Sequence, residues 1–274
     1  MKLMTSINPL MFFSIIFLWL ISACDDNPVM YSEKQELPSR VHELEETYLL
    51  NIFLPKGVSF PNIASGESEK GLQVLYVLDA DKHAEKTALT VHKLELPLIT
   101  VGVGYSDDNR RERDYTPTNW QFDDAGGADV FFEFMEKDVF PFMETEYHVG
   151  KDSADRFILG WSLGGLAAIY VSLSNPDLFS GYITVSPSLM WDSQYIFSLE
   201  QEKRLGNNTR KGFIGLYAGS HEFPGTVAAV DAYYERLQSY YPNIITDFAV
   251  FNNRAHTSVF KDAVYHGLKA CFNR

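Results

Sequence analysis

One short motif in this chain can carry acyl-transfer chemistry. Gly160-Trp161-Ser162-Leu163-Gly164 fits the pattern G-x-S-x-G, with the apolar residues 157–159 before it and an Ala- and Leu-rich segment after it. That is the strand–turn–helix setting in which a serine is exposed on a sharp turn. A serine hydroxyl becomes nucleophilic when a histidine, itself oriented by a carboxylate, takes its proton. We therefore predict a hydrolase with Ser162 as the nucleophile.

The order of residues along the chain narrows the choice of base. In sites built on this motif the nucleophile comes first, the acid next and the histidine last. His221, His256 and His266 follow Ser162. His256 stands between the last expected strand and the last expected helix, in a loop at the sheet edge where such sites lie, whereas His266 is expected within that helix. We predict His256 as the base.

Three possibilities remain for the acid. Glu222 is the first choice because it stands in the loop after an expected strand at 213–218. Asp192, in the loop after the expected strand at 182–185, is the alternative. A Ser–His pair working without an acid is the third possibility, and Glu222 would then be a solvated carboxylate or a helix cap.

The oxyanion that forms during acyl transfer needs backbone donors. One is expected from the N–H of Leu163, directly after the nucleophile. The second should come from the loop that follows the apolar run ending at Leu78. The amides of Ala80 and Asp81 are both open, and Ala80 is the candidate that we carry forward.

Substrate contacts are harder to infer. Trp161, Trp191 and Tyr105 could wall a pocket for an aromatic or acyl group, although aromatic side chains more often pack in a core. Arg113, in a charged loop at 105–127 with Arg110 and Arg111, could bind an anionic group or be solvated. No H-E-x-x-H, paired-cysteine or phosphate-loop pattern occurs in the sequence, so we expect neither a metal nor a cofactor.

The surrounding pattern must place these residues. Near-continuous apolar runs predict buried strands, and helical segments are expected between and after them. Alternating strands and helices indicate an α/β protein with the α/β-hydrolase layout, a mostly parallel sheet covered by helices on both faces. Pro141 should interrupt a helix at 128–147. The expected strands are 47–55, 72–78, 98–104, 157–159, 182–185, 213–218 and 244–251, and the other expected helices are 84–95, 226–240 and 257–270.

The N-terminus has the pattern of an export signal. Lys2 precedes an apolar stretch at 10–21, which is short for a membrane span of about 20 residues. Leu20-Ile21-Ser22-Ala23-Cys24 then resembles a bacterial lipobox, in which the cysteine is acylated and starts the mature chain. An ordinary secretory signal or an uncleaved anchor is the alternative.

These segments predict three parts: a lipoprotein signal peptide at 1–23, a flexible tether at 24–40 and an esterase domain at 41–274. The net charge of −13 disfavours nucleic acid as a partner. The expected partners are a small ester and, through the lipid on Cys24, a membrane, and no obligate protein partner is evident. We expect an extracytoplasmic location on the periplasmic face of a bacterial membrane, with Asp25 favouring the inner one.

Several segments together carry a resemblance to a known family: residues 74–81, 101–105, 113–117, 160–166, 176–179, 186–192 and His256 with Ser258-Val259. On these segments the chain resembles the esterase family that includes the enterochelin (trilactone siderophore) esterases. The resemblance implies an α/β-hydrolase fold, carboxylic-ester hydrolysis without a cofactor, and Ser162 with His256 as the catalytic pair; the family often has glycine where Ala80 stands. A non-catalytic binding lipoprotein and an acyltransferase or thioesterase are the rival hypotheses.

Overall fold

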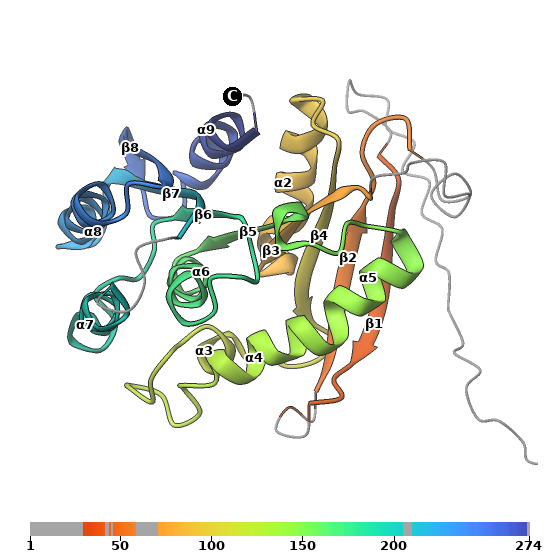
Figure 1. Ribbon diagram of the computed structural model, residues 1–274, viewed down its shortest axis with the longest axis horizontal. Coiled ribbons are helices and arrows are strands. Elements are labelled where there is room, and N and C mark those ends of the chain that lie inside the picture. The colour runs from red at the N-terminus through yellow and green to blue at the C-terminus, as the bar shows by residue number, and fades with distance from the viewer. Residues whose placement is uncertain (1–29, 42–43, 45, 59–70, 205–209, 273–274) are drawn as a thin grey trace, which may run out of the picture.

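One mixed sheet of eight strands organises the chain, in the order β1-β2-β4-β3-β5-β6-β7-β8 (Figure 1). The computed structural model describes residues 30–41, 44, 46–58, 71–204 and 210–272. Strands β3 to β8 run parallel, while β1 and β2 are antiparallel to their neighbours. The α/β-hydrolase fold with a mostly parallel sheet is therefore confirmed.

The elements follow the expected alternation closely. The strands are β1 (Ser32–Pro38), β2 (Thr47–Phe53), β3 (Gln73–Leu78), β4 (Leu98–Tyr105), β5 (Arg156–Trp161), β6 (Gly181–Val185), β7 (Gly212–His221) and β8 (Ile244–Ala255). The helices are α2 (Ala80–Lys93), α3 (Arg111–Asp114), α4 (Ala128–Phe134), the π-helical η1 (Met135–Val139), α5 (Phe140–Tyr147), the 3₁₀ turn η2 (Ser153–Asp155), α6 (Leu163–Ser174), α7 (Trp191–Arg204), α8 (Thr226–Tyr240) and α9 (Phe260–Phe272).

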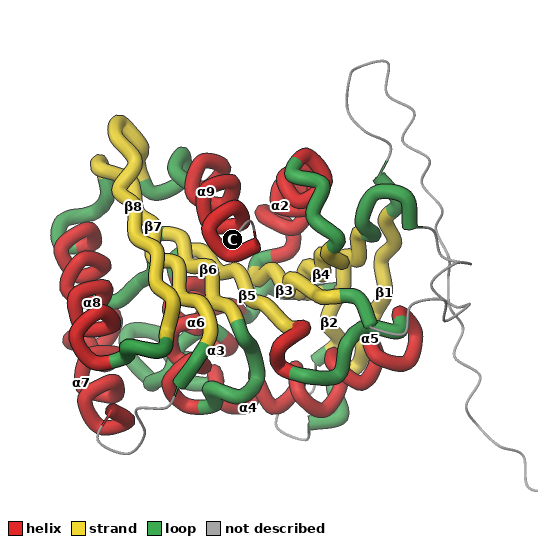
Figure 2. Tube along the Cα trace, turned by 45° about the horizontal axis from the view of Figure 1, so that its top comes forward, coloured by secondary structure: helices red, strands yellow, loops and turns green. Residues whose placement is uncertain are grey.

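Helices cover both faces of the sheet (Figure 2). Helices α2 and α9 pack on one face, around a cluster that includes Leu75, Val77 and Val264. The remaining long helices pack on the other face, in a larger cluster that includes Phe131 and Leu166. Burial on both faces explains why the central strands have nearly continuous apolar sequences.

The prediction of a flexible tether at 24–40 is wrong for residues 32–38. Residues Ser32–Pro38 form β1, which pairs antiparallel with β2 from Ser32 opposite Phe53 to Pro38 opposite Thr47. Strand β1 lies at the edge of the sheet, and none of its residues is fully buried. Its sequence SEKQELP is therefore polar and lacks the hydrophobic alternation by which a strand is predicted. The lipid-anchor residue Cys24 and Asp25 lie outside the described residues.

The interruption expected at Pro141 is present. Helix α4 passes through the π-helical turn η1 before α5 begins, with Pro141 in the first turn of α5. Proline cannot donate to the carbonyl four residues earlier, which belongs to Lys137. The Arg40 guanidinium donates to that carbonyl instead. Within the described part of the chain, no helix has the length and apolarity needed to cross a membrane.

Candidate active site

Ser162 occupies a strained turn between β5 and α6. Its φ of 58° and ψ of −117° lie outside the usual regions for a residue with a side chain. The Ser162 N–H donates to the carbonyl of Val185 at 3.0 Å, which ties the turn to the end of β6. A Cβ on Gly160 would overlap the carbonyl oxygen of Gly164, so this close approach of strand and helix requires glycine. The geometry is that of the predicted nucleophile elbow.

A chain of short contacts joins Ser162 to a histidine and a carboxylate. Nε2 of His256 lies 3.1 Å from Oγ of Ser162. Nδ1 of His256 lies 2.7 Å from Oε2 of Glu222. The carboxylate favours the tautomer in which Nδ1 carries the proton and Nε2 faces the serine, which is the arrangement needed to take the hydroxyl proton.

Glu222 is itself held in place at the end of β7. Its Oε1 accepts hydrogen bonds from the hydroxyl of Ser186 and from the Gly219 N–H at 3.1 Å. Only 1% of its side chain is exposed. Asp192, the alternative acid, makes no hydrogen bond or ion pair to His256 among the described residues and has a φ of 43° at the start of α7. The structure thus brings Glu222, rather than Asp192, to the histidine.

Trp161 supports the loop that carries His256. Its indole N–H donates to the His256 carbonyl at 2.9 Å, and the two rings lie 4.8 Å apart between centroids. On another side the ring of Phe223 lies 4.9 Å from the imidazole. Trp161 therefore contacts His256 directly, and the hydrogen bond to the His256 carbonyl orients its indole ring.

The two expected oxyanion donors begin neighbouring helices. Leu163 is the first residue of α6 and Ala80 the first of α2. The first amides of a helix have no intrahelical acceptor. The two helix starts are adjacent, because a Cβ on Gly164 would lie 3.3 Å from Cβ of Leu78 and 3.4 Å from Oδ2 of Asp79. Both N–H groups are thus available beside the nucleophile.

A buried ion pair holds the loop before Ala80. Asp79 has a left-handed backbone, with a φ of 55°, and is fully buried. Arg111 donates to both of its carboxylate oxygens, from Nε at 2.7 Å and from Nη2 at 3.1 Å. The Asp79 N–H donates to the Tyr115 hydroxyl at 3.1 Å. Burial raises the pKa of the Asp79 carboxyl, and Arg111 opposes that rise.

His83 lies below this loop, on the buried side of α2. Its ring stacks on Phe260 at 3.9 Å and meets Trp161 edge-on at 5.2 Å. Neither ring nitrogen has a hydrogen-bond partner among the described residues. Burial, with Lys86 and Lys82 nearby, lowers the pKa of His83 to about 3. His83 is therefore a neutral packing residue beneath the site.

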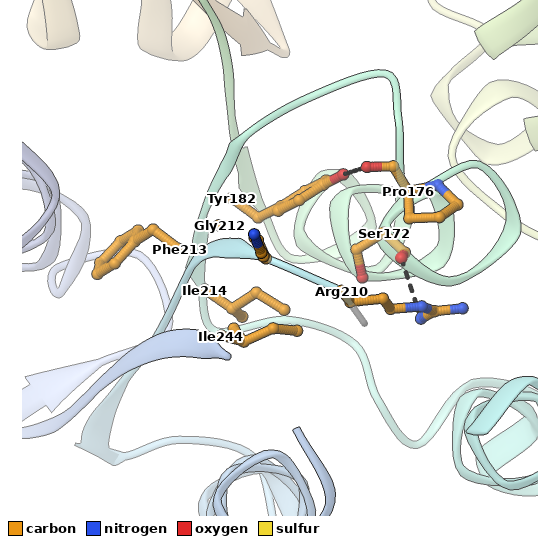
Figure 3. Close-up of a pocket in the computed structure, with 9 residues that line it drawn as sticks. Ser172, Pro176, Tyr182, Arg210, Gly212, Phe213, Ile214 and Ile244 are labelled. Atoms are coloured by element: carbon orange, nitrogen blue, oxygen red, sulfur yellow. Dashed lines mark hydrogen bonds between the residues drawn. The ribbon is translucent and has the colours of Figure 1, made fainter. Parts of the chain in front are cut away.

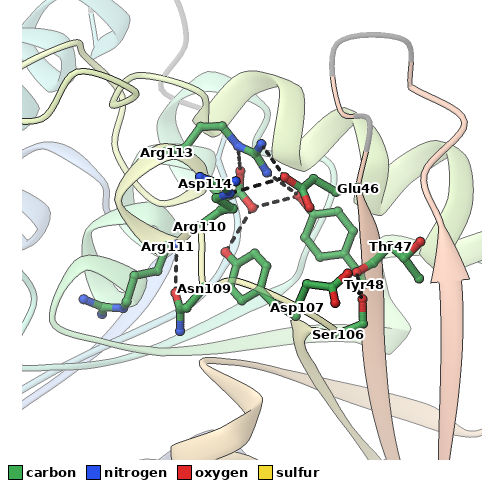
Figure 4. A network of polar contacts seen from close by, with 11 residues as sticks. Glu46, Thr47, Tyr48, Ser106, Asp107, Asn109, Arg110, Arg111, Arg113 and Asp114 are labelled. Carbon is green, nitrogen blue, oxygen red and sulfur yellow. Dashed lines mark hydrogen bonds and ion pairs between the residues drawn. The ribbon is translucent and has the colours of Figure 1, made fainter.

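Arg113 and Tyr105 belong to a separate polar network (Figure 4). Both donate to the buried carboxylate of Asp114, from Nε of Arg113 at 2.7 Å and from the Tyr105 hydroxyl at 2.9 Å. Glu46 and Tyr48 complete the network. Among the described residues, no hydrogen bond, ion pair or ring contact joins Arg113 or Tyr105 to Ser162, His256 or Glu222. These two residues therefore do not contact the three catalytic candidates directly, and their place in a substrate pocket stays a prediction.

Trp191 lies closer to the site. The segment before it is attached to the nucleophile, since the Ser188 N–H donates to the Ser162 carbonyl at 3.1 Å and the two hydroxyl oxygens are 3.4 Å apart. The Trp191 N–H in turn donates to the Ser188 carbonyl at 3.0 Å. The Trp191 indole N–H donates to the Thr118 hydroxyl at 2.9 Å, and its ring is buried.

A small pocket at the opposite end of the sheet is unrelated to this chemistry (Figure 3). It opens at the amino ends of β6, β7 and β8, beside Tyr182, Gly212 and Ile244. Arg210 lines it and donates to the carbonyls of Ser172 and Leu173 at the end of α6. The nucleophile lies at the carboxyl ends of the strands, where sites of parallel sheets form.

Sequence reasoning missed Ser186, Ser188 and the Asp79–Arg111 pair. Ser186 and Asp79 follow directly after β6 and β3, and polar residues at that position are a usable signal for a site at this edge. The partner of Asp79 lies 32 residues away in a loop, so no local pattern could identify it. Within the described ranges, no group of His, Cys, Asp and Glu side chains is arranged to hold a metal ion.

Comparison with known proteins supports the same assignment. Residues 41–228 match a family model described as "Putative esterase". A ferri-bacillibactin esterase of Bacillus subtilis is 30% identical over 236 residues, which is 73% of this chain and 78% of the relative. A siderophore triacetylfusarinine C esterase of Aspergillus fumigatus is 36% identical over 102 residues, 35% of each chain.

Solved structures agree on the fold. The BES protein from Bacillus cereus superposes with a TM-score of 0.77 at 24% identity, covering 93% of this chain and 98% of that one. An IroE-like serine hydrolase from Shewanella oneidensis gives a TM-score of 0.76 at 24% identity, covering 89% and 80%.

Proposed function

This chain belongs to the esterase family and cleaves ester bonds, and on that basis we propose that it is a serine esterase working through an acyl-enzyme. The observation that carries the proposal is the contact chain from Ser162 through His256 to Glu222, with separations of 3.1 and 2.7 Å. A histidine with a purely structural role would not require a carboxylate on one ring nitrogen and a strained serine hydroxyl on the other. The relatives are named as siderophore esterases, so siderophore-like esters are the first natural substrates to test.

The reaction would proceed in two halves. His256 takes the proton of the Ser162 hydroxyl as its oxygen attacks the ester carbonyl carbon, and the Leu163 and Ala80 amides stabilise the oxyanion. The C–O bond of the ester then breaks, and His256 returns the proton to the departing alcohol. A water molecule then attacks the acyl carbonyl carbon while His256 takes its proton. The bond from that carbon to Oγ of Ser162 breaks, His256 returns the proton to Oγ, and the carboxylic acid is released.

Two measurements test this mechanism. A fluorophosphonate probe should label wild-type protein at Ser162 and leave Ser162→Ala unlabelled. Hydrolysis of short 4-nitrophenyl esters should fall at least about a thousandfold in the same variant. A folded wild type that neither labels nor hydrolyses these esters would reject the serine mechanism. A panel of siderophore trilactones, acylated sugars, simple esters and thioesters then ranks the substrate classes.

The proposed setting is a lipid tether outside the cytoplasm. The support is the lipobox-like sequence ending at Cys24 and the aspartate that follows it. Acyl chains would anchor the mature chain, each buried CH₂ contributing about 0.8 kcal/mol. Cells expressing wild type should incorporate labelled palmitate into the protein, and Cys24→Ala should incorporate none. Equal labelling of both proteins would reject the proposed lipid anchor at Cys24, and the esterase proposal would not be affected.

A further inference from the structure

Exposed apolar side chains gather at the mouth of the proposed site. Phe122, Met190 and Phe223 are 42%, 45% and 65% exposed, and we call them the apolar rim. The ring of Phe223 lies against His256, as described above. The ring of Phe122 stacks with that of Trp191 at 6.1 Å, and Met190 precedes Trp191 in the chain.

Contacts through Trp191 and Gly225 connect the three rim residues to one another and to the Ser162 segment. A Cβ on Gly225 would lie 2.6 Å from Sδ of Met190, so Met190 packs beside the segment that carries Phe223. Ser188 is hydrogen-bonded to Ser162, and Met190 follows Ser188 by two residues in the turn that Trp191 closes. Met190 therefore lies in the segment that is attached to Ser162. An ester bound at Ser162 would therefore cover apolar surface that water now contacts.

The guanidinium groups around the site are already paired. Arg111 is bound to Asp79, as described above, and Arg113 is bound to Asp114 and Glu46. Arg254, on the strand that leads to His256, pairs with Asp262 at 2.5 Å. A substrate anion would have to displace a carboxylate from one of these arginines. Lys82, exposed in the first turn of α2, makes no ion pair within the described residues.

Carboxylates without such partners lie next to the rim residues and to Ala80 in the sequence. Asp123 and Asp124 follow Phe122 and are exposed, Asp192 follows Trp191, and Asp81 is exposed at the start of α2. None of them forms an ion pair in the part of the chain that the structure describes. The whole chain carries a net charge of −13. A negatively charged ester would therefore approach against like charge and lose water without gaining a cation.

From these observations, and resting on the serine esterase function proposed above, we infer that the site selects esters whose groups near the scissile bond are uncharged and apolar. It should discriminate against anionic esters.

A matched pair of substrates tests the inference. The 4-nitrophenyl esters of pentanoic acid and of glutaric acid have equal acyl chain lengths, and the second ends in a carboxylate instead of a methyl group. We expect kcat/KM at least about tenfold higher for the pentanoate, with the gap narrowing as salt is raised, because salt screens the rim carboxylates. Equal or faster turnover of the glutarate would overturn the inference. If neither ester is cleaved and Ser162 does not label, the serine mechanism falls and the inference falls with it.

Variants identify the surface responsible. Phe122→Ala should raise KM for the pentanoate about five- to tenfold. Ile245 is also an exposed apolar residue, at 54%, and lies at the end of β8 away from His256, so Ile245→Ala is the matched control and should leave KM unchanged. The double variant Asp123→Asn/Asp124→Asn should raise kcat/KM for the glutarate selectively. Equal KM values in Phe122→Ala and wild type would exclude the rim from substrate binding.

Lys82 provides the opposing test. If it recruited anionic esters, Lys82→Gln would slow the glutarate and spare the pentanoate, which would contradict the inference. We expect equal relative rates in Lys82→Gln and wild type.

Discussion

The carboxylate of Glu222 and the imidazole of His256 lie 2.7 Å apart, from Oε2 to Nδ1, and come from the loops after two neighbouring parallel strands, β7 and β8. The same carboxylate is bound through its other oxygen to Ser186, after β6. Loops from three adjacent strands thus converge on one acidic side chain. This convergence makes Glu222 testable as the third member of the site.

Replacing Glu222 should separate a triad from a dyad. Glu222→Gln keeps the shape but favours the wrong tautomer of His256, so kcat should fall by about 10³- to 10⁴-fold. Asp192→Asn is the control and should stay within about twofold of wild type, because Asp192 does not contact His256. Steady-state hydrolysis of a neutral 4-nitrophenyl ester measures both. A Glu222→Gln enzyme with near wild-type kcat would mean that Ser162 and His256 work without an acid.

Arg111 should act as a positioning residue for the Ala80 amide. Arg111→Lys keeps the charge but loses the two parallel hydrogen bonds to Asp79. We expect kcat to fall about 10- to 100-fold with KM little changed, because the oxyanion donor shifts while the substrate contacts remain. The companion variant Arg111→Ala should regain activity when guanidinium is added at low concentration. A purely structural role for Arg111 would change stability in both variants without this kinetic pattern.

Loss of the whole ion pair should be tolerated better than loss of half of it. Arg111→Gln leaves the Asp79 carboxylate buried without its cation and should lower the free energy of unfolding by about 3–5 kcal/mol. Asp79→Asn combined with Arg111→Gln removes both charges and should recover most of that loss. Urea unfolding of wild type, the single variant and the double variant measures the difference. Similar instability of the single and double variants would contradict the assignment of a buried charge as the cause.

His83 should make stability depend on pH in a defined window. Its pKa in the folded protein is about 3, against an ordinary value of 6.5. Between these values the unfolded chain binds the proton and the folded chain does not, so His83 destabilises the fold as the pH falls from about 6.5. The free energy of unfolding of wild type should decline relative to His83→Phe by up to about 1.4 kcal/mol per pH unit. Denaturant unfolding of both proteins at pH 7, 6 and 5 gives this difference. If the free energy of unfolding changed with pH equally in wild type and His83→Phe, His83 would not remain neutral in the folded protein.

The contact between β5 and α6 predicts the effect of one methyl group. Gly160→Ala would push the added Cβ into the Gly164 carbonyl, and we expect a loss of at least about 3 kcal/mol in the free energy of unfolding. Gly57→Ala is the comparison variant, because Gly57 has a positive φ of 81° but no atom lies within 4 Å of its added Cβ, so it measures backbone strain without overlap. That variant should cost about 1–2 kcal/mol. Gly160 has no positive φ, so a loss at Gly160 no larger than that at Gly57 would contradict a severe overlap with the Gly164 carbonyl.

Patterns repeated along the chain were sufficient to predict most of the fold. The apolar runs at 98–104 and 213–218 form β4 and β7, and the predicted helix at 226–240 is α8 with the same bounds. Burial imposes a local period on each of these segments, which is visible in the sequence. Strand β1 was missed because an edge strand of polar residues has no such period. The G-x-S-x-G motif identified Ser162 for a related reason, since the close approach of β5 and α6 requires glycine two positions before the serine.

The partners of Ser162 were decided by tertiary structure. Sequence order favoured His256 and left Glu222, Asp192 and a dyad open, because the direction of a loop side chain depends on packing between distant segments. The charged loop around Arg113 could not be assigned either. Only the folded chain shows that Arg113 pairs with Asp114, that Arg111 pairs with Asp79, and that Phe122 and Phe223 remain exposed beside the nucleophile. The sequence by itself therefore determined the nucleophile and its scaffold, which depend on local backbone geometry. The acid, the neutralised arginines and the apolar rim depend on contacts between loops far apart in the chain.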